Sequence, residues 1–401
     1  MAERDYSRLA ATAFARERVE RLTALVIGAG ALGNEVIKNL ALLGVGTIWI
    51  LDRDHVERSN LTRSVLFCVP DIEVHLANRT PKAQLAARRA GEINPDVSAT
   101  GYLGEIADFG LGFLRRANVV FACLDNEMAR LEISWSCTRA NRPLVDGGLG
   151  TTNYSSGQVV VFPGAEGPCS ACRKSSAQRG RLLQELQGRE DPCWLKERAS
   201  EDVAMITTTP LMASIVGAFQ VEMGLRAVLG DAPPADTGTA HRIVLHPLPL
   251  LETATFTRSP NCPLHEAASV LRKVEERMVS ADTCTPADLL GGDASAVLGL
   301  DWPLTARASC RACGHAWEPL VRRARFRHDR CPACGSDDVV ELDVLTAVSA
   351  DSPWAGRTFA SLGLPRGGVF EIVTGADMDA PRRHVELTGD LAGVRQASVT
   401  S

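Results

Sequence analysis

The sequence predicts an α/β protein whose main domain is a doubly wound sheet and whose carboxy-terminal part is a cysteine-rich appendage. Three observations support this class. Apolar segments with strand character alternate with helical segments through about residue 165, as a doubly wound sheet requires. A turn containing three glycines joins the first strand to the following helix. Two Cys-x-x-Cys pairs lie close together beyond residue 300.

The first βαβ unit occupies residues 25–51. Residues 25–27 form an apolar strand pattern, residues 34–43 a helical pattern and residues 47–51 a second strand. The turn after the first strand reads Gly28-Ala29-Gly30-Ala31-Leu32-Gly33. Its glycines permit a tight turn, a close approach of the backbone to phosphate and close packing of helix on strand. The unit is Rossmann-like and predicts a nucleotide site; the alternative is a turn of this kind without a ligand.

Polar side chains follow the strands of this unit. Asp52 ends the second strand, where a carboxylate can accept hydrogen bonds from ribose hydroxyls. Two carboxylates, an amide and two cations come later: Asp54, Asp125, Asn60, Arg63 and Lys82. A nicotinamide enzyme needs few charges at this place, whereas the set suits a triphosphate with magnesium. Each of the last three residues also has a structural alternative when it is taken singly. Asn60 fits a helix cap, Arg63 a surface ion pair and Lys82 a solvated helix residue.

The rest of the main domain continues the alternation. Residues 9–22 have a helical pattern that fits a surface helix. The expected strands are 97–102, 119–123, 143–146 and 158–162, and the expected helices are 82–93, which Asn94-Pro95 ends, and 127–140. A polar excursion without any strand pattern follows at 173–202, and loops of this length are usually functional or mobile.

Order resumes at a threonine-rich cap. Thr207-Thr208-Thr209-Pro210 supplies a cap and an early-helix proline for an apolar helix at 211–229. The segments that follow are a linker at 231–238, one or two strands within 241–251 and a turn at 259–265. Beyond them we expect a helix at 267–279, a cysteine-paired module at 308–340 and a last segment that includes strands at 370–373 and 384–387.

The cysteine-paired module predicts a zinc ribbon. Cys310-x-x-Cys313 and Cys331-x-x-Cys334 let four thiolates converge on one tetrahedral metal ion, and each pair is followed by a glycine, Gly314 or Gly335, where the backbone amides turn towards sulfur. The module is too short to bury much core, so zinc would supply much of its folding energy. Disulfides or a redox pair are the alternatives.

A second set of metal ligands is spread along the chain. Cys169 and Cys172 have a partner pair in Cys262 and His265, and three thiolates with one imidazole suit zinc. The alternative is a free cysteine pair and an unrelated surface histidine.

Composition limits the class and compartment of the protein. The 401 residues are 45% hydrophobic and 23% charged, with a net charge of -5, so there is no general basic footprint for nucleic acid. The arginine-rich run at 322–327 fits a solvated face or a partner-binding edge. We expect no membrane span and no signal peptide, and therefore a cytoplasmic protein. The 12 cysteines agree with a reducing compartment.

Taken together, these motifs resemble the MoeB/ThiF and ubiquitin-activating (E1-like) enzymes, which adenylate the carboxy-terminal glycine of ubiquitin-like proteins. The resemblance covers about residues 5–265. Its motifs are Asp5-Tyr6-Ser7-Arg8, the glycine turn, Asp52-Arg53-Asp54, Ser59-Asn60-Leu61-Thr62-Arg63, Lys82 with Ile93-Asn94-Pro95, Asp125-Asn126 with Arg130, Gly147-Gly148, Gly157-Gln158-Val159, Cys169-x-x-Cys172 and Pro260-Asn261-Cys262-Pro263-Leu264.

The resemblance implies a role for each matching residue. Asp52 would hold the ribose of ATP, and Asp125, beside Asn126, would hold Mg²⁺ near the α-phosphate. The phosphates would be contacted by Asn60, Arg63 and Lys82. Arg8 matches the arginine that members of the family insert from the opposite protomer into the ATP site, which implies a homodimer. Fixed cations and magnesium then stabilise the charge that builds up as the substrate carboxylate attacks the α-phosphorus.

The sequence departs from the family pattern at three places. Ser64 stands where a glutamine commonly follows the Asn-x-x-Arg motif, which puts one polar contact in doubt. His265 stands where the second knuckle usually ends in cysteine; because imidazole can replace the thiolate, the resemblance supports a mixed zinc site. The segment between Arg8 and the first strand looks shortened, which weakens the placement of Arg8.

The resemblance also makes residues 173–206 the crossover loop, where thioester-forming members keep their nucleophile. Cys193 is the cysteine of that segment, and Lys196 and Arg198 lie near enough in sequence to lower its pKa. The alternative is that Pro192-Cys193-Trp194 only packs against an apolar patch.

The predicted organisation has four parts: an adenylation domain at 1–268, a helix and linker at 269–305, a zinc ribbon at 306–340 and a small carboxy-terminal module at 341–401 with a frayed tail. The first functional hypothesis is activation of a ubiquitin-like protein with ATP, Mg²⁺ and two structural Zn²⁺ ions, followed by thioester formation on Cys193 and transfer to a conjugating enzyme. The second is a sulfur-carrier or small-molecule adenylyltransferase without a thioester. The third is a zinc-ribbon scaffold with an inactive nucleotide site.

Overall fold

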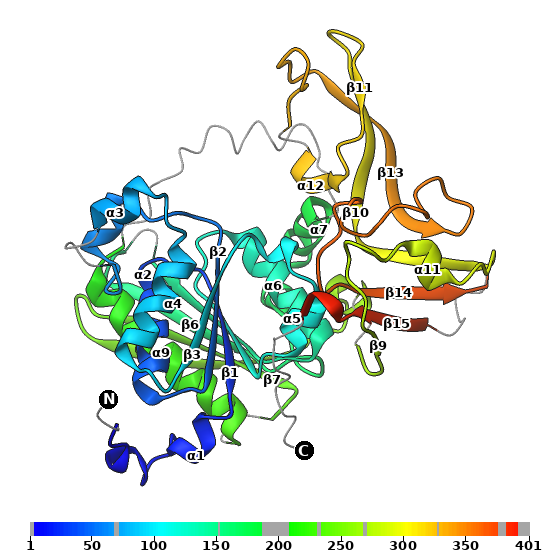
Figure 1. Ribbon diagram of the computed structural model, residues 1–401. Helices are drawn as coiled ribbons and strands as arrows, with labels where there is room; N and C mark the ends of the chain where they lie inside the picture. Colours follow the sequence, from blue (N-terminus) through cyan, green and yellow to red (C-terminus); the bar gives the residue numbers. More distant parts are fainter. Residues whose placement is uncertain are drawn as a thin grey trace.

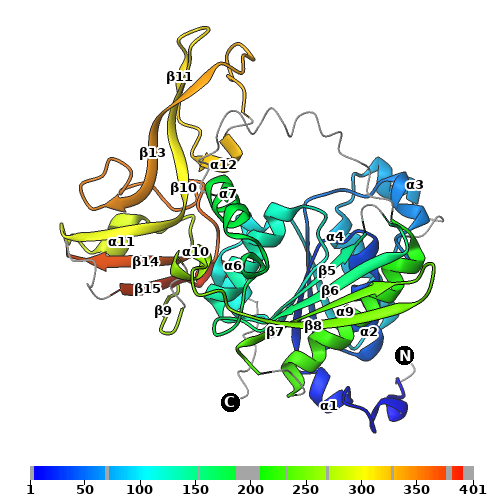
Figure 2. The ribbon, with the colours of Figure 1, turned by 180° about the vertical axis from the view of Figure 1, so that it is seen from behind.

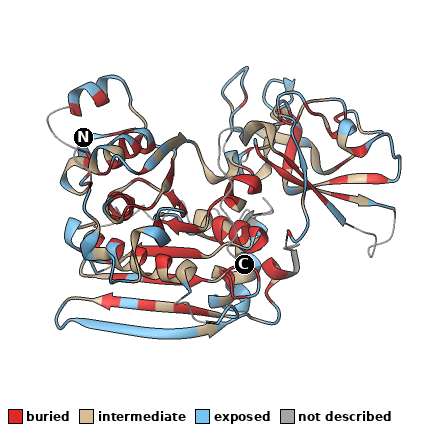
Figure 3. Ribbon diagram, turned by 60° about the horizontal axis from the view of Figure 1, so that its bottom comes forward, coloured by how far each residue is buried: buried red, intermediate tan, exposed pale blue. Residues whose placement is uncertain are grey.

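The computed structural model describes residues 4–67, 72–150, 153–186, 208–230, 234–267, 271–326, 329–375 and 382–391. The described chain forms two sheets. An eight-stranded sheet lies in the amino-terminal part, and a seven-stranded sheet lies in the carboxy-terminal part (Figure 1). Buried residues concentrate in the strands and on the helix faces turned towards them (Figure 3).

The eight-stranded sheet confirms the predicted α/β class. Its order is β3-β2-β1-β4-β5-β6-β7-β8. The pairs among β1 to β5 are parallel, and the pairs from β5 to β8 are antiparallel. The strands are β1 (Thr23–Ile27), β2 (Thr47–Asp52), β3 (Ser98–Leu103), β4 (Val119–Ala122), β5 (Leu144–Leu149), β6 (Ser156–Phe162), β7 (Thr237–Val244) and β8 (Leu250–Thr257).

Helices cover both faces of this sheet (Figures 1 and 2). One hydrophobic core lies under α2 (Ala31–Leu43), α4 (Lys82–Ile93) and α9 (Pro210–Leu229). A second core lies under α5 (Leu111–Arg115) and α6 (Glu127–Ala140). The short α3 (Ile72–Ala77) precedes α4. The helices at 82–93 and 127–140 therefore occur where the sequence predicts them.

Helix α9 begins and ends as its sequence signals predict. The Thr209 hydroxyl accepts a hydrogen bond from the Met212 amide, Pro210 opens the helix, and Gly230 ends it in the left-handed conformation. By length and composition alone this helix is also apolar enough to cross a membrane, which the sequence analysis did not anticipate. Its Met212, Val216, Val221 and Leu225 belong to the first hydrophobic core, as in a core helix.

The second sheet differs from the predicted division of the carboxy-terminal part. Its main order is β11-β10-β14-β15-β9, with β12 and β13 paired to β10. The strands are β9 (Glu275–Arg277), β10 (Ala296–Cys310), β11 (Ala316–Trp317), β12 (Val321–Arg322), β13 (Val339–Ser349), β14 (Val369–Thr374) and β15 (Arg382–Leu387). Because β10 pairs with strands from both sides of residue 340, the ribbon and the last segment share one sheet, as does part of the predicted linker.

Other local expectations were wrong for identifiable reasons. Residues 9–22 hold only the short η1 (Ser7–Leu9) and α1 (Arg16–Val19). Between them the Thr12 hydroxyl donates to the Leu9 carbonyl and accepts from the Phe14 amide, and such local bonds compete with a helix. Residues 275–277 are strand β9 and not helix, since they pair in parallel with β15.

Further elements were not predicted, among them α3, α5 and three later helices. The polar excursion begins with α7 (Ser176–Leu186), the turn at 259–265 includes the start of α10 (Pro263–Ala267), and α11 (Pro286–Leu290) precedes β10. Part of the arginine-rich run is solvated and part is not: Arg322 ends β12, α12 (Arg323–Phe326) follows it, and Arg325 is exposed whereas Arg322 and Arg323 are half-buried. Arg322, Arg323 and Arg325 pair with Glu132, Glu341 and Asp108, so two of the three join the second sheet to the main domain.

Candidate functional site

The candidate nucleotide site lies at the carboxyl ends of β1, β2 and β4. The chain passes from β1 to β2 and β3 on one side and then returns to β4 on the other, so β1 and β4 flank the point where the strand order reverses. Ligands of open α/β sheets bind at such a point. The glycine turn follows β1, Asp52 ends β2, and Asp125 follows β4, which brings these predicted residues to one edge.

Two glycines of the turn have no room for a side chain, whereas the third has free space around it. A Cβ atom on Gly28, whose φ is +94°, would lie 2.4 Å from the Cys123 carbonyl oxygen. A Cβ atom on Gly33 would lie 1.8 Å from the Gly28 oxygen. A Cβ atom on Gly30 would meet no atom within 4 Å. The space at Gly30 fits the close approach of a phosphate group to the turn.

Asp52 holds the glycine turn against the end of β2. Its Oδ2 accepts a hydrogen bond from the Ala29 amide at 2.6 Å, and its Oδ1 accepts one from the Asp54 amide at 2.7 Å. Burial raises the pKa of Asp52, while these two hydrogen bonds act in the opposite direction. The carboxylate is thus fixed beside the turn, where a ribose would approach.

Lys82 and Asp54 form an ion pair at the same edge. The Lys82 Nζ atom lies 2.9 Å from Asp54 Oδ2, and the Lys82 side chain is 10% exposed while that of Asp54 is 55% exposed. The Lys82 amide also donates to the Asp54 carbonyl at 2.9 Å. The Lys82 side chain is therefore largely buried, and its ammonium group lies beside the more exposed Asp54 carboxylate. A cation held in this way can bind a phosphate group.

Asn60 and Asn126 have structural partners. The Asn60 amide oxygen accepts a hydrogen bond from the Glu57 amide at 2.9 Å and caps η2 (Arg58–Thr62). The Asn126 amide oxygen accepts from the Met128 and Ala129 amides at 2.8 and 3.2 Å and caps α6. Each asparagine therefore fits the helix-cap interpretation, and a role of either in nucleotide binding stays a prediction.

Arg63 and Asp125 have side chains free to bind a ligand. Arg63 is half-buried and Asp125 is exposed, and neither makes a side-chain hydrogen bond or ion pair in the described part of the chain. Ser64 is buried next to Arg63, and its hydroxyl has no hydrogen-bond partner among the described residues. An exposed carboxylate after β4 and a free guanidinium after η2 suit Mg²⁺ and a phosphate respectively.

Three residues that the sequence analysis missed support the site. Asn34 is fully buried; its amide nitrogen donates to the Ala29 and Gly30 carbonyls, and its oxygen accepts from the Leu66 amide. Gln220 of α9 donates to the Ala122 and Val145 carbonyls at the ends of β4 and β5. Arg53 pairs with Glu105 at 3.0 Å, which raises the pKa of the Arg53 guanidinium. A polar residue on the buried face of a helix was the available signal for Asn34 and Gln220.

Arg8 lies far from this edge within its own chain. It is exposed in η1, and its neighbour Tyr6 lies close to Gly44, which follows the end of α2. The Asn94 amide, just after α4, donates to the Tyr6 hydroxyl at 2.8 Å. Helices α2 and α4 both run from the carboxyl ends of the strands towards their amino ends. Arg8 therefore lies at the amino ends of the strands, opposite the glycine turn. Arg8 and the nucleotide site of one chain are therefore not brought together.

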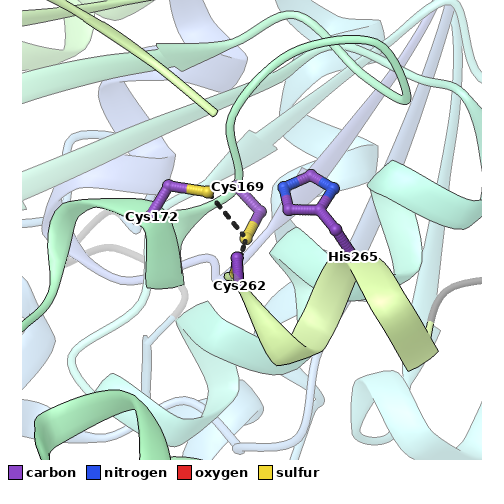
Figure 4. A group of neighbouring side chains, drawn as sticks. All are labelled: Cys169, Cys172, Cys262 and His265. Atoms are coloured by element: carbon purple, nitrogen blue, oxygen red, sulfur yellow. Dashed lines mark hydrogen bonds between the residues drawn. The ribbon is translucent and has the colours of Figure 1, made fainter. Parts of the chain in front are cut away.

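The first predicted metal cluster is assembled. Cys169, Cys172, Cys262 and His265 place their ligand atoms within 4.8 Å of one another, and their side chains point towards a common centre (Figure 4). The Cys169 sulfur lies 3.8 Å from that of Cys172 and 3.7 Å from that of Cys262. Sulfurs bound to one tetrahedral zinc ion are about 3.8 Å apart, since each Zn–S bond is about 2.3 Å. Disulfide sulfurs would be about 2 Å apart.

The imidazole of His265 supports a metal at this place. Its Nε2 atom is buried and has no hydrogen-bond partner among the described residues. An unpaired buried polar atom is costly, and a metal bond would satisfy it. The Ser259 amide donates to the Cys172 sulfur at 3.4 Å, and hydrogen bonds with Cys169 and Cys262 lower the pKa of Cys172, which favours a thiolate. The donor set fits zinc.

The second predicted metal cluster is also assembled. Cys310, Cys313, Cys331 and Cys334 form a group of the same size, with sulfur distances of 3.6 Å between Cys310 and Cys334 and 3.7 Å between Cys313 and Cys331. Gly314 and Gly335 both have a φ of +74°, as the knuckle interpretation predicts. These distances fit a zinc ribbon and exclude disulfides between these pairs. Cys193 lies outside the described residues.

Comparisons with known proteins agree with this geometry. Residues 6–264 match the model of the ThiF family. The chain is 35% identical to mouse ubiquitin-like modifier-activating enzyme 7 over 38% of this chain and 16% of that protein. It is 34% identical to the Escherichia coli sulfur carrier protein ThiS adenylyltransferase over 37% of this chain and 56% of that protein. These two matches cover less than two thirds of either relative.

Two other similarities extend further. A sulfur carrier protein adenylyltransferase of Thermus thermophilus is 28% identical, over 62% of this chain and 84% of that protein. The crystal structure of E. coli MccB with MccA-N7isoASN has a TM-score of 0.51 and 20% sequence identity, and the match covers 66% of this chain and 75% of that one. The structural similarity supports the fold alone.

Proposed function

Because the chain belongs to the ThiF family, we propose that it is an ATP-dependent adenylating enzyme that activates the carboxy-terminal glycine of a ubiquitin-like protein. The observation that carries this proposal is the set of charged side chains at the carboxyl ends of β1, β2 and β4. Lys82 and Arg63 supply cations, and Asp125 supplies a carboxylate without a partner in the described chain. These charges suit a triphosphate with magnesium better than a neutral or singly charged ligand.

Each residue of the site has a task in the proposed reaction. Asp52 would bind the ribose, the glycine turn and the amino terminus of α2 would face phosphate oxygens, and Arg63 and Lys82 would hold the phosphates. A carboxylate oxygen of the ubiquitin-like protein attacks the α-phosphorus, and the bond to pyrophosphate breaks. The fixed cations stabilise the charge on the departing pyrophosphate. Mg²⁺, held by Asp125, would supply further charge neutralisation.

We further propose that the acyl group then passes to Cys193. The thiolate attacks the acyl carbon of the adenylate, the carbon–sulfur bond forms, AMP leaves, and the thiol proton goes to solvent. Transfer to the thiol of a conjugating enzyme would follow. The support is the place of Cys193 within residues 173–206, the segment that the resemblance makes the crossover loop.

The active unit in this proposal is a homodimer. Arg8 and the nucleotide site of one chain lie at opposite edges of the sheet, so Arg8 would reach only the site of a second copy. Zinc at both cysteine clusters is proposed to be structural, because all eight ligands are protein groups and structural zinc sites have four. Thiol ligands of this kind fit the cytoplasm.

A second candidate is a sulfur-carrier or small-molecule adenylyltransferase that forms no thioester. The similarity to the T. thermophilus sulfur carrier protein adenylyltransferase, which extends over 84% of that protein, favours it. Adenylation is common to both candidates, so Cys193 separates them.

The test is a reaction of the purified chain with ATP, Mg²⁺ and a β-grasp protein that ends in glycine. A non-reducing gel and intact mass detect a covalent adduct, and a coupled assay detects pyrophosphate. The proposal predicts an adduct that thiols remove and that is lost in Cys193→Ala, while pyrophosphate release persists. Pyrophosphate release without any adduct would establish the second candidate instead.

A further inference from the structure

Three of the four residues of the first metal cluster, Cys169, Cys172 and Cys262, belong to a separate hydrophobic cluster or pack against it. Its buried members are Leu131, Trp135, Cys169, Ala171, Cys262 and Leu264. Partly buried side chains from two other places pack on it: Leu182 and Leu183 of α7, and Trp302 of β10. The metal ligands therefore lie where the main domain, the start of the polar excursion and the second sheet meet, as the positions of α6, α7 and β10 show in Figures 1 and 2.

Helix α7 is attached to the ligand-bearing segments at several points. Cys172 belongs to η5 (Ser170–Arg173), and the chain continues from η5 into α7. Arg179 of α7 donates to the Ser259 hydroxyl at 2.7 Å, and the Ser259 amide donates to the Cys172 sulfur. Among residues 176–184 of α7, whose side chains the structure describes, none is fully buried, so these bonds and the contacts of Leu182 and Leu183 hold the helix in place.

The second sheet reaches the same cluster through β10. The rings of Trp302 and Trp135 have centroids 4.5 Å apart. Arg322 stacks over Trp302 at 5.1 Å and pairs with Glu132 of α6 at 2.6 Å. Trp302 is thus held between the metal-site cluster and a charged pair that also crosses the interface.

Without a metal ion this junction would hold several unsatisfied groups. The ligands come from two segments distant in sequence, residues 169–172 and 262–265. The His265 Nε2 atom is buried without a partner in the described structure, although the ligand atoms of all four residues lie within 4.8 Å of one another. A metal ion bound by all four residues closes the long loop between the segments and fixes the surface on which α7 and β10 pack.

We propose that the Cys169/Cys172/Cys262/His265 metal site is the latch that fastens both α7 and the second sheet to the main domain. The proposal rests on the zinc binding proposed above. It gives this metal a role that the ribbon metal lacks, since the ribbon cysteines lie at the far end of β10, beyond the contacts of Trp302. Loss of the first metal then loosens α7 and the second sheet, although neither contributes a ligand to that metal.

The test is hydrogen exchange by mass spectrometry on the full chain, with zinc content measured on the same samples. His265→Ala removes one ligand. It is expected to lower the zinc content by one ion per chain and to speed exchange in peptides of 176–186 and 296–306 by about tenfold or more, while strands β1 to β4 stay protected. Loss of one zinc ion with both peptides unchanged would overturn the proposal.

Matched variants separate this result from other causes. His265→Cys supplies a thiolate in place of the imidazole and is expected to restore both zinc and protection. Cys334→Ser removes the ribbon metal and is expected to leave peptide 176–186 unchanged; faster exchange there would contradict the distinction between the two sites. A wild-type chain with fewer than two zinc ions would instead refute the proposed zinc sites.

A variant that leaves every ligand in place covers the case in which His265→Ala does not fold. Trp302→Ala is expected to keep two zinc ions and to speed exchange in 296–306, because it removes only the contact of β10 with the cluster. Unchanged exchange there would show that the second sheet does not depend on this junction, which would also overturn the proposal.

Discussion

At the scale of single residues, the candidate nucleotide site contains two kinds of side chain. Some accept hydrogen bonds from backbone amides, and others have no partner in the described chain. Asp52 and Asn60 accept backbone hydrogen bonds, whereas Arg63 and Asp125 have no side-chain partner in the described chain. Residues of the first kind shape the turn and the loop. Residues of the second kind contribute little to stability, so their removal should affect ligand binding and not folding.

The Arg63→Ala variant tests this division. Because Arg63 has no partner to lose, the free energy of unfolding should change by less than about 0.5 kcal/mol. The rate of adenylation should fall by about 10²- to 10³-fold, as for removal of one fixed donor from a site of developing charge. The measurements are denaturant unfolding and pyrophosphate release. Arg58→Ala is the matched control, since its ion pair with Glu73 is exposed; an equal loss of rate there would contradict the assignment.

The glycine turn gives a second prediction at this scale. Gly33→Ala places a methyl group against the Gly28 oxygen and should destabilise the fold by about 1–3 kcal/mol or more. Gly30→Ala meets no protein atom and should leave stability within about 0.5 kcal/mol while weakening ATP binding. Thermal unfolding and ATP titration distinguish the two variants. Normal ATP affinity in Gly30→Ala would show that the space at Gly30 is not used by phosphate.

At the scale of elements, the sequence predicts the first sheet well and the second poorly. The strands and helices between residues 23 and 162 have clear apolar patterns and turn signals, so their bounds follow from local sequence. A helix was expected at strand β9. Its three charged residues, Glu275, Glu276 and Arg277, carry no apolar alternation, and only pairing with β15 makes them a strand. Helix α7 was not predicted, because its sequence has no apolar stripe of the kind that faces a large core. It packs instead on the metal-site cluster through Leu182 and Leu183.

Strand β7 carries a pH-sensitive residue. His241 is buried, with its ring nitrogens on the hydroxyls of Thr253 and Thr239, and burial lowers its pKa below 6.5. The unfolded chain then binds a proton more readily than the folded one, so this residue lowers the free energy of unfolding as pH falls through 6.5. His241→Gln should lose stability at all pH values, but its stability should decline less between pH about 7.5 and 6 than that of the wild type. Denaturant unfolding at both pH values measures the difference, and equal slopes would contradict it.

At the scale of the whole molecule, the two sheets are joined by buried charges as well as by apolar contacts. Glu386 of β15 is fully buried and pairs with Arg115, the last residue of α5, and with Arg116, which follows it. The Gly110 and Gly112 amides also donate to the Arg366 and Gly367 carbonyls. The sequence could not predict this junction, because single charged residues far apart in the chain give no pattern that pairs them.

The Glu386→Gln variant tests the junction. It leaves two largely buried guanidinium groups without their carboxylate and should cost about 3–5 kcal/mol of unfolding free energy. Glu275→Gln removes an exposed pair with Arg383 on the same sheet and should cost less than about 1 kcal/mol. Equal losses in both variants, measured by denaturant unfolding, would show that the buried pair does not hold the two parts together.

The site was predicted more completely than the fold around it. The glycine turn, Asp52, Lys82 and Asp125 meet at one edge because parallel strands bring their carboxyl ends together. The ribbon cysteines come together as their spacing indicates, and Cys169, Cys172, Cys262 and His265 come together as the family resemblance implies. The supporting roles of Asn34 and Gln220 were missed, because a buried polar residue reveals its partners only in the folded chain. The sequence offered a helix cap as the alternative for Asn60 but did not reveal that Asn126 is also a cap.

The central claim is that the polar edge of the first sheet catalyses adenylation. Exchange of labelled pyrophosphate into ATP, with Mg²⁺ and a β-grasp protein that ends in glycine, measures that step directly. The account predicts exchange by the wild-type chain, its loss in Asp125→Ala and its retention in Glu92→Ala, whose carboxylate lies near the end of α4 at the opposite edge. Exchange that survives Asp125→Ala, or that falls equally in both variants, would contradict the proposed site.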